Sequence, residues 1–131
     1  MRSLVADTHA LVWHLTAPER LGKTARRLFA QADAGRATVH VPVVALVEIS
    51  LLHERGRLRF GADRVVQLLA RQPGWQVLAL DIEQCLMFAA LTGVKDPMDR
   101  LIAASAKALA LPLVSADEGF DGVDGVERTW D

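Results

Sequence analysis

The sequence predicts an α/β fold, a three-layer sandwich in which a mainly parallel central sheet is covered by helices on both faces. Short apolar segments with strand character alternate with helical segments of at least nine residues, which is the pattern of parallel strand pairing. Glycine and proline fall between these segments, and no repeat or low-complexity tract interrupts them. With 131 residues, 51% of them hydrophobic, the chain is expected to form one domain over residues 1–131.

The first half of the chain contains two strand-like and four helix-like segments. Strands are expected over residues 3–6 and 38–41, and helices over 8–16, 23–34, 43–55 and 62–71. Pro18 ends the first helix, Gly35 ends the second, and Gly56 is a left-handed cap for the third. The second helix has apolar residues at helical spacing, namely Ala25, Leu28, Phe29 and Ala32.

The second half repeats the alternation with clearer helix starts. Strands are expected over residues 75–78, 112–115 and 126–129, helices over 82–91 and 97–109, and a turn-rich loop over 117–125. Asp81 and Gln84 have the spacing of a capping box. Asp96 suits the N-cap of the next helix and Pro97 its first position.

Cysteine content and hydropathy limit the location of the protein. Cys85 is the only cysteine, so the sequence has neither an intrachain disulfide nor a cysteine-rich zinc site. The N-terminus lacks the apolar core of a signal peptide, and no apolar run approaches the roughly 20 residues of a membrane span. We therefore expect a cytoplasmic protein with no membrane contact.

The formal net charge of −1 argues against a strongly basic nucleic-acid-binding protein, but the charge is unevenly distributed. Residues 1–72 carry 11 Lys and Arg against 6 Asp and Glu, whereas residues 73–131 carry 4 against 10. Twelve of the 15 basic residues are arginines, whose planar guanidinium suits phosphate. Either the first half helps to hold an anionic ligand, or the arginines reflect a general compositional bias on solvated helix faces.

Four carboxylates stand where such a fold would bring them together. Asp7 and Asp117 follow strands, at the sheet edge where ligands of α/β sheets bind. Glu48 and Asp99 lie on apolar faces of their helices, where an unpaired charge is unfavourable and which no lysine or arginine shares. A hard divalent cation, Mg²⁺ or Mn²⁺, is the natural counter-ion because it takes several oxygen ligands.

Most of these carboxylates also have an ordinary structural interpretation. Asp7 is well placed to cap the first helix, Asp99 gains from the helix dipole, and Asp117 lies in a common turn sequence. Asp96 is a helix N-cap close to the expected site. Neither capping nor solvation explains Glu48, which is therefore the most informative of the set.

Other chemistries find little support in the sequence. The four histidines lack the spacing of zinc ligands and are expected to be solvated or at helix ends. No glycine-rich phosphate loop follows a strand, and no serine lies in a glycine elbow. Nucleoside triphosphate hydrolysis and serine-hydrolase chemistry are therefore disfavoured.

Four segments together resemble the PIN-domain family, and most closely its VapC-type toxins from bacterial toxin–antitoxin pairs. In chain order these segments read VADTHALVW over residues 5–13, ALVEI around Glu48, DPMDRLIAA over 96–104 and LVSAD over 113–117. The resemblance covers essentially the whole chain. It implies a Mg²⁺- or Mn²⁺-dependent endoribonuclease that leaves 5′-phosphate and 3′-hydroxyl ends, with Asp7, Glu48, Asp99 and Asp117 as catalytic metal ligands.

Several further expectations concern residues around this site. The hydroxyls of Thr8 and Ser115 are candidates for hydrogen bonds to the metal-binding carboxylates, or are ordinary capping and turn groups. Arg100 is a candidate contact for substrate phosphate, or a solvated helix arginine. Two departures from the family pattern, Val94-Lys95 and Pro42-Val43, affect the surroundings of the site and none of its ligands.

Partners follow from the apolar first helix and from the resemblance. Residues 10–15 make the first helix apolar nearly all round. One side of this helix is therefore expected to meet a second protein, with Leu28 and Phe29 as the far wall of a hydrophobic groove. The alternative is that the chain's own loops cover that side. The resemblance implies a cognate antitoxin in that groove, a homodimeric toxin and an RNA substrate.

Two other functions remain as alternatives. A receiver-like signalling module also clusters aspartates around Mg²⁺, but here only Asp81 follows the 75–78 strand, where it is better explained as a cap. A non-catalytic PIN-like binding module is the stronger alternative, and a metal-dependent cleavage assay separates it from a nuclease.

Overall fold

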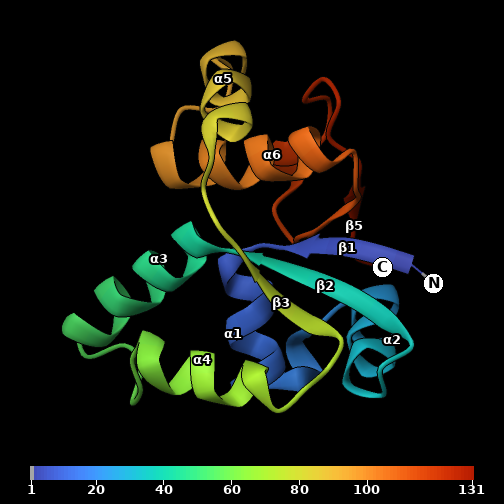
Figure 1. The fold of residues 1–131 in the computed structure, drawn as a ribbon, viewed down its shortest axis with the longest axis vertical. Coiled ribbons are helices and arrows are strands. Elements are labelled where there is room, and N and C mark those ends of the chain that lie inside the picture. Colours follow the sequence, from blue (N-terminus) through green and yellow to red (C-terminus); the bar gives the residue numbers. More distant parts are fainter. Residues whose placement is uncertain (1) are drawn as a thin grey trace.

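The central sheet has five strands in the order β3-β2-β1-β4-β5 and is parallel throughout. This arrangement is seen in a computed structural model that describes residues 2–131 (Figure 1). The strands are β1 Arg2–Ala6, β2 Ala37–Pro42, β3 Trp75–Leu78, β4 Leu113–Val114 and β5 Arg128–Thr129. The predicted α/β class and parallel sheet are confirmed, although the last two strands are shorter than expected.

The described residues form six α-helices, all within a few residues of the expected ranges. They are α1 Thr8–Thr16, α2 Lys23–Asp33, α3 Val43–Glu54, α4 Ala62–Ala70, α5 Ile82–Ala90 and α6 Pro97–Leu109. Two short 3₁₀ helices, η1 Pro18–Arg20 and η2 Glu118–Phe120, were not expected.

Helices cover both faces of the sheet, as predicted. Figure 1 shows α1 to α4 on one side of the strands and α5 and α6 on the other. Alternate residues of β1 serve the two layers, because Leu4 and Ala6 pack with the first group and Val5 packs with the second. Two apolar cores on opposite faces of the sheet therefore hold the strand ends in place.

The helix boundaries follow the expected capping chemistry. The Asp81 carboxylate accepts a hydrogen bond from the backbone N–H of Gln84, whose side chain accepts one from the N–H of Asp81, which completes the capping box. Asp96 caps α6 through bonds from the next two N–H groups in the helix. Gly56 has φ of 73°, so it adopts the left-handed conformation expected after α3.

Among residues 2–131, the chain itself covers much of the side of α1 that was expected to line an open groove. Leu28 and Phe29 are both 0% exposed, so the expectation that they form a groove wall is wrong. Trp13 packs against Trp130 from the C-terminal end of the chain. The large apolar side chains that are most exposed lie elsewhere, at Val47, Leu80, Ile82 and Leu86. No helix among residues 2–131 is both long enough and apolar enough to cross a membrane.

Candidate metal and active site

The candidate site lies where the strand order of the sheet reverses. From β1 the chain continues to β2 and β3 on one side, whereas β4 and β5 lie on the other side of β1. Ligands of open parallel sheets bind beyond the carboxyl ends of the strands at such a reversal. Asp7 directly follows β1, and its N–H donates to the carbonyl of Val114 at 3.1 Å. Asp117 follows β4 after two intervening residues, so both aspartates belong to this edge.

Asp7 is a buried helix cap as well as a member of the site. Its side chain accepts a hydrogen bond of 2.8 Å from the N–H of Ala10, as expected of an N-cap. The residue is only 7% exposed. Burial raises the pKa of its carboxyl, while hydrogen bonds from Ser115 and Ala10 oppose that rise. The fold thus holds a carboxylate where its charge is poorly solvated.

Glu48 projects from α3 toward Asp7. Its carboxylate accepts a hydrogen bond of 2.5 Å from the hydroxyl of Thr8, which immediately follows Asp7. Burial raises the pKa of Glu48, and the charges of Asp96 and Asp7 raise it further, against the effect of Thr8. The inward orientation that the apolar helix face indicated is present, with Thr8 as a hydrogen-bond partner.

Asp99 is a third carboxylate whose pKa is raised. It lies in the first turn of α6, next to the cap residue Asp96, whose Oδ1 accepts bonds from the N–H groups of Met98 and Asp99. The pKa of Asp99 is raised to about 6, mainly by burial and then by the charges of Asp96, Glu48 and Asp117. The charges of the neighbouring carboxylates thus outweigh the opposing effect of His9 at this position.

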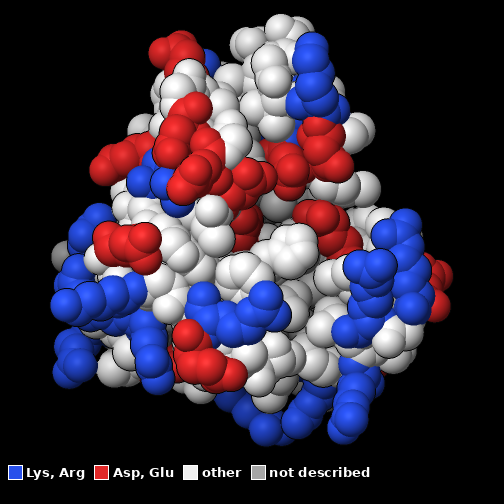
Figure 2. Space-filling model, turned by 180° about the vertical axis from the view of Figure 1, so that it is seen from behind, with Lys and Arg blue, Asp and Glu red and all other residues white. Residues whose placement is uncertain are grey.

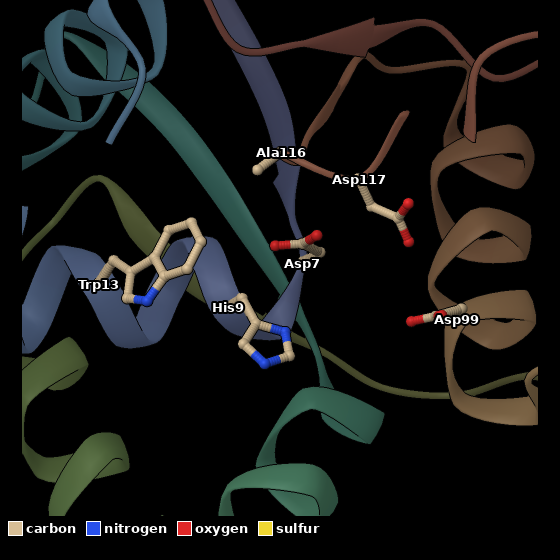
Figure 3. Close-up of a pocket in the computed structure, with 6 residues that line it drawn as sticks. All are labelled: Asp7, His9, Trp13, Asp99, Ala116 and Asp117. Atoms are coloured by element: carbon tan, nitrogen blue, oxygen red, sulfur yellow. The ribbon is translucent and has the colours of Figure 1, made fainter. Parts of the chain in front are cut away.

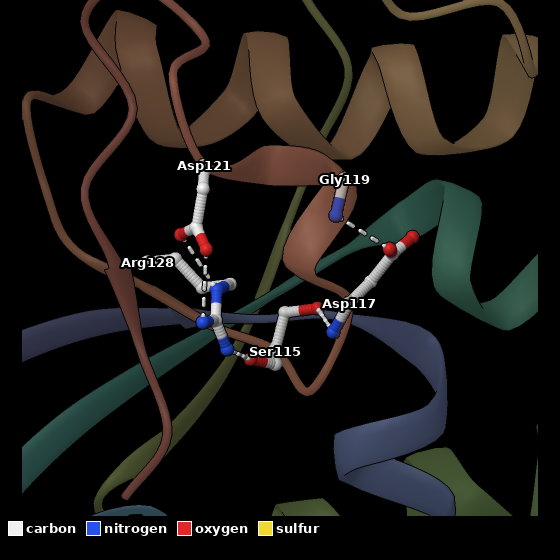
Figure 4. A network of polar contacts seen from close by, with 5 residues as sticks. All are labelled: Ser115, Asp117, Gly119, Asp121 and Arg128. Atoms are coloured by element: carbon white, nitrogen blue, oxygen red, sulfur yellow. Dashed lines mark hydrogen bonds and ion pairs between the residues drawn. The ribbon is translucent and has the colours of Figure 1, made fainter.

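Asp117 is exposed and is held by a short polar network (Figure 4). Its Oδ1 accepts from the N–H of Gly119 at 2.8 Å, and its own N–H donates to the hydroxyl of Ser115 at 3.0 Å. Arg128 donates to both carboxylate oxygens of Asp121, at 2.8 and 3.1 Å, and to the carbonyl of Ser115 at 3.2 Å. Arg128 therefore ties the loop that carries Asp117 to the edge of the sheet.

Three of the four carboxylates line one pocket of about 330 Å³ (Figure 3). Its lining residues are Asp7, His9, Trp13, Asp99, Ala116 and Asp117. Glu48 is not in the lining, but its charge raises the pKa of Asp99. Within residues 2–131, none of the four carboxylates forms an ion pair with Lys, Arg or His.

The chemistry of these donors fits Mg²⁺ or Mn²⁺. All four side chains offer carboxylate oxygens, which hard divalent cations prefer. In the described part of the chain, no three His, Cys, Asp or Glu side chains are placed to coordinate one ion directly. Mg²⁺ usually keeps several of its waters and binds proteins through one or two carboxylates, so it does not require three direct ligands here.

Arg100 makes several contacts inside the protein. Its Nε donates to the carbonyl of Val94 at 2.7 Å, and another guanidinium nitrogen lies 3.5 Å from the carbonyl of Thr92. The guanidinium also lies over the ring of Phe88, 4.6 Å from its centre. These contacts hold the segment before α6 and engage part of the guanidinium, and the expected phosphate contact of Arg100 stays a prediction.

The structure adds two residues that the sequence analysis did not assign to the site. His9 is exposed at the pocket, and the charge of its ring lowers the pKa of Asp7, Glu48 and Asp99. Trp13 lines the same pocket. Both positions were detectable in principle, because residues 9 and 13 lie one turn apart on a helix that begins directly after Asp7.

Comparison with protein families gives a match over most of the chain. The family model described as PIN domain matches residues 4–126. No curated protein is similar enough to count as a match.

Solved structures share the fold at low sequence identity. VapBC2 from Rickettsia felis, bound to a DNA fragment from its promoter, is 14% identical with a TM-score of 0.72, covering 98% of this chain and 99% of that one. DNA-bound VapBC from Salmonella typhimurium is 14% identical, with a TM-score of 0.69 and 98% coverage of both chains. VapBC-5 from Mycobacterium tuberculosis is 23% identical, with a TM-score of 0.58 and 98% coverage of both. At these identities, the similarity establishes a common fold.

Proposed function

The chain belongs to the PIN-domain family, and from that premise we propose that it is a metal-dependent endoribonuclease acting as the toxin of a toxin–antitoxin pair. One observation carries the proposal. Asp7, Asp99 and Asp117 come from three separate elements and line one pocket, with Glu48 close enough to act on it electrostatically, and no described cation pairs with any of them. Such a cluster needs a cation to be stable when ionised.

The residues divide into those that would hold the cation and those that position them. Asp7, Glu48, Asp99 and Asp117 would bind Mg²⁺ or Mn²⁺, directly or through water. Thr8 orients Glu48, and Ser115 orients Asp7 and the Asp117 backbone. When bound, the cation would supply an activated water and neutralise charge on the phosphate.

The reaction that this site would support is hydrolysis of an RNA phosphodiester bond. The water oxygen forms a bond to phosphorus while the bond to the 3′ oxygen breaks. The attacking water gives up one proton to solvent and the 3′ oxygen takes one up from solvent, which leaves 5′-phosphate and 3′-hydroxyl ends. Because the proposed substrate is RNA, we expect the protein to act in the cytoplasm.

The partners of the protein are part of the same proposal. Several structures with this fold are toxin–antitoxin complexes, which favours an antitoxin as the cognate partner.

We also propose that the toxin is a homodimer. The exposed apolar side chains on and before α5, Ile82 at 76%, Leu86 at 67% and Leu80 at 45%, provide a surface of the kind that marks protein contacts. Light scattering should show a dimer that Ile82→Lys converts to a monomer, whereas a monomeric wild type contradicts the dimer.

A non-catalytic PIN-like module is the alternative that an activity assay must exclude. Purified protein should cleave single-stranded RNA with Mg²⁺ or Mn²⁺, lose this activity in EDTA, and lose it in Asp7→Asn, which keeps both the cap and the shape of Asp7. Circular dichroism of the variant controls for folding. Cleavage that persists in EDTA, or in a folded Asp7→Asn protein, contradicts the proposed reaction.

A further inference from the structure

One wall of the acidic pocket is aromatic, and metal binding does not account for it. His9 and Trp13 line the pocket opposite the loop that carries Asp117 (Figure 3). Their ring centres are 6.1 Å apart, and the rings are tilted by 54°. Because both side chains project from the helix that Asp7 caps, they have a fixed position relative to the carboxylates.

Trp13 packs against a second tryptophan and yet remains accessible. The ring of Trp130 supports it at 5.8 Å with a tilt of 59°, while the indole stays only partly buried. Trp75 provides the contrast, since it is 5% exposed and its indole N–H donates to Asp33. Within residues 2–131, the indole N–H of Trp13 donates to no protein group, which leaves it open to a ligand.

Arg20 adds a positive charge to this aromatic wall. Its guanidinium lies 4.5 Å from the centre of the Trp13 ring, and the side chain is exposed on η1. It forms no ion pair with any described residue. Figure 2 shows Lys and Arg side chains around the lower half of the molecule, beneath a band of Asp and Glu. A cation that stacks on an aromatic ring beside a carboxylate cluster can contact a nucleobase or a neighbouring phosphate.

The aromatic wall and its positive charge together suit one nucleotide of single-stranded RNA. Proteins bind unpaired bases by stacking them on aromatic rings or on arginine guanidinium planes, and they bind the backbone through cations. Bases inside a duplex already stack on one another and are not available for such contact. The pocket volume of about 330 Å³ is within the range of small-ligand sites.

We infer that Trp13, flanked by His9 and Arg20, is a stacking subsite for an unpaired base next to the scissile phosphate. This inference rests on the proposed function, because the carboxylate site fixes where the scissile phosphate lies. The subsite selects single strands over duplexes and sets the position of the cut relative to the stacked base.

Binding of two matched probes tests the subsite without cleavage. One probe is a fluorescein-labelled strand of twelve riboadenosines, and the other has the same backbone and length without bases. Fluorescence anisotropy with Ca²⁺ in place of Mg²⁺ gives both dissociation constants, and a gel verifies that the probes stay intact. Since stacking contributes about 1–3 kcal/mol per base, wild type should bind the base-bearing strand roughly 5- to 150-fold more tightly.

The variants separate stacking from charge. Trp13→Leu should bring the ratio of the two constants close to one, and Trp13→Phe should keep most of it. Arg20→Gln should weaken the base-bearing strand several-fold, whereas Arg64→Gln, an exposed arginine on α4, should leave the ratio unchanged. If Trp13→Leu fails to fold, tryptophan quenching serves instead. The base-bearing strand should quench the wild type more than the abasic strand does, and Trp13→Phe should remove that difference.

Failure of the subsite can be distinguished from failure of the proposed function. Equal binding of the two probes by wild type, with metal-dependent cleavage intact, overturns the subsite alone. An unchanged ratio in a folded Trp13→Leu protein does the same. Absence of both RNA binding and cleavage overturns the nuclease, and the subsite with it.

Discussion

Asp99→Asn should stabilise the protein in the absence of metal, although it removes a proposed ligand. The pKa of the Asp99 carboxyl is about 6 in the folded protein against 3.8 in a model peptide. A difference of about two pKa units corresponds to at most roughly 3 kcal/mol between the ionised and protonated forms. The side chain is only half-buried, so solvent screening reduces this, and we expect a gain of about 1 kcal/mol.

The pH dependence has a definite sign. Because the folded pKa is raised, the favourable contribution of the protonated carboxyl is complete below about pH 4 and is lost as the pH rises through about 6. Asparagine imitates the neutral form at every pH. The advantage of Asp99→Asn should therefore be largest above pH 7 and should shrink as the pH falls from 6 toward 4.

Thermal melts followed by circular dichroism provide the assay. In EDTA at pH 7.5, Asp99→Asn should melt roughly 3–5 °C above wild type, and Glu127→Gln, which neutralises an exposed carboxylate elsewhere, should change little. In saturating Mg²⁺ the order should reverse, since wild type binds the cation more tightly. Two results would contradict destabilisation by the ionised Asp99 carboxylate. One is an Asp99→Asn protein that is less stable than wild type in EDTA at pH 7.5, and the other is a gain in melting temperature that is the same at pH 4.

Two further substitutions test the positioning of Glu48 and the packing around the C-terminal end. Thr8→Val removes the hydroxyl that donates to Glu48, so titration calorimetry should show a roughly tenfold loss of Mn²⁺ affinity, which Thr8→Ser restores. Unchanged affinity in Thr8→Val means that the hydrogen bond does not matter for the site. Gly22→Ala places a Cβ 2.4 Å from the carbonyl oxygen of Trp130, so urea unfolding should show a loss of roughly 1–3 kcal/mol. Gly93→Ala, which meets nothing within 4 Å, should cost much less, and equal losses in the two variants contradict the clash.

The parts of the fold and site that depend on local sequence were predictable. Asp81 with Gln84 and Asp96 with Pro97 carry their capping chemistry within four residues, so the starts of α5 and α6 are where the sequence indicated. Glu48 was identifiable because an unsolvated carboxylate on an apolar helix face needs a partner. The structure supplies Thr8 as one such partner, and the proposed metal ion is the other.

Contacts between distant parts of the chain could not be predicted in the same way. Trp130 supports Trp13 from the opposite end of the sequence, and the apolar pattern of α1 alone does not distinguish this contact from one with an outside partner. Leu28 and Phe29 have the spacing of an amphipathic helix, which indicates that they are buried but not what covers them. Arg128 holds the loop of Asp117 through Asp121, a geometry that no local pattern in the sequence indicates.

Mn²⁺ binding tests most directly whether the four carboxylates form one metal site. Electron paramagnetic resonance of free Mn²⁺ gives the affinity of wild type and of Asp7→Asn, Glu48→Gln, Asp99→Asn and Asp117→Asn, with Glu127→Gln as the control. If the four carboxylates form one site, wild type and the control should bind Mn²⁺ alike, and each of the four variants should bind it more weakly by roughly tenfold or more, the effect of losing one charged ligand partner. Affinities that are unchanged in all four folded variants would contradict a shared metal site.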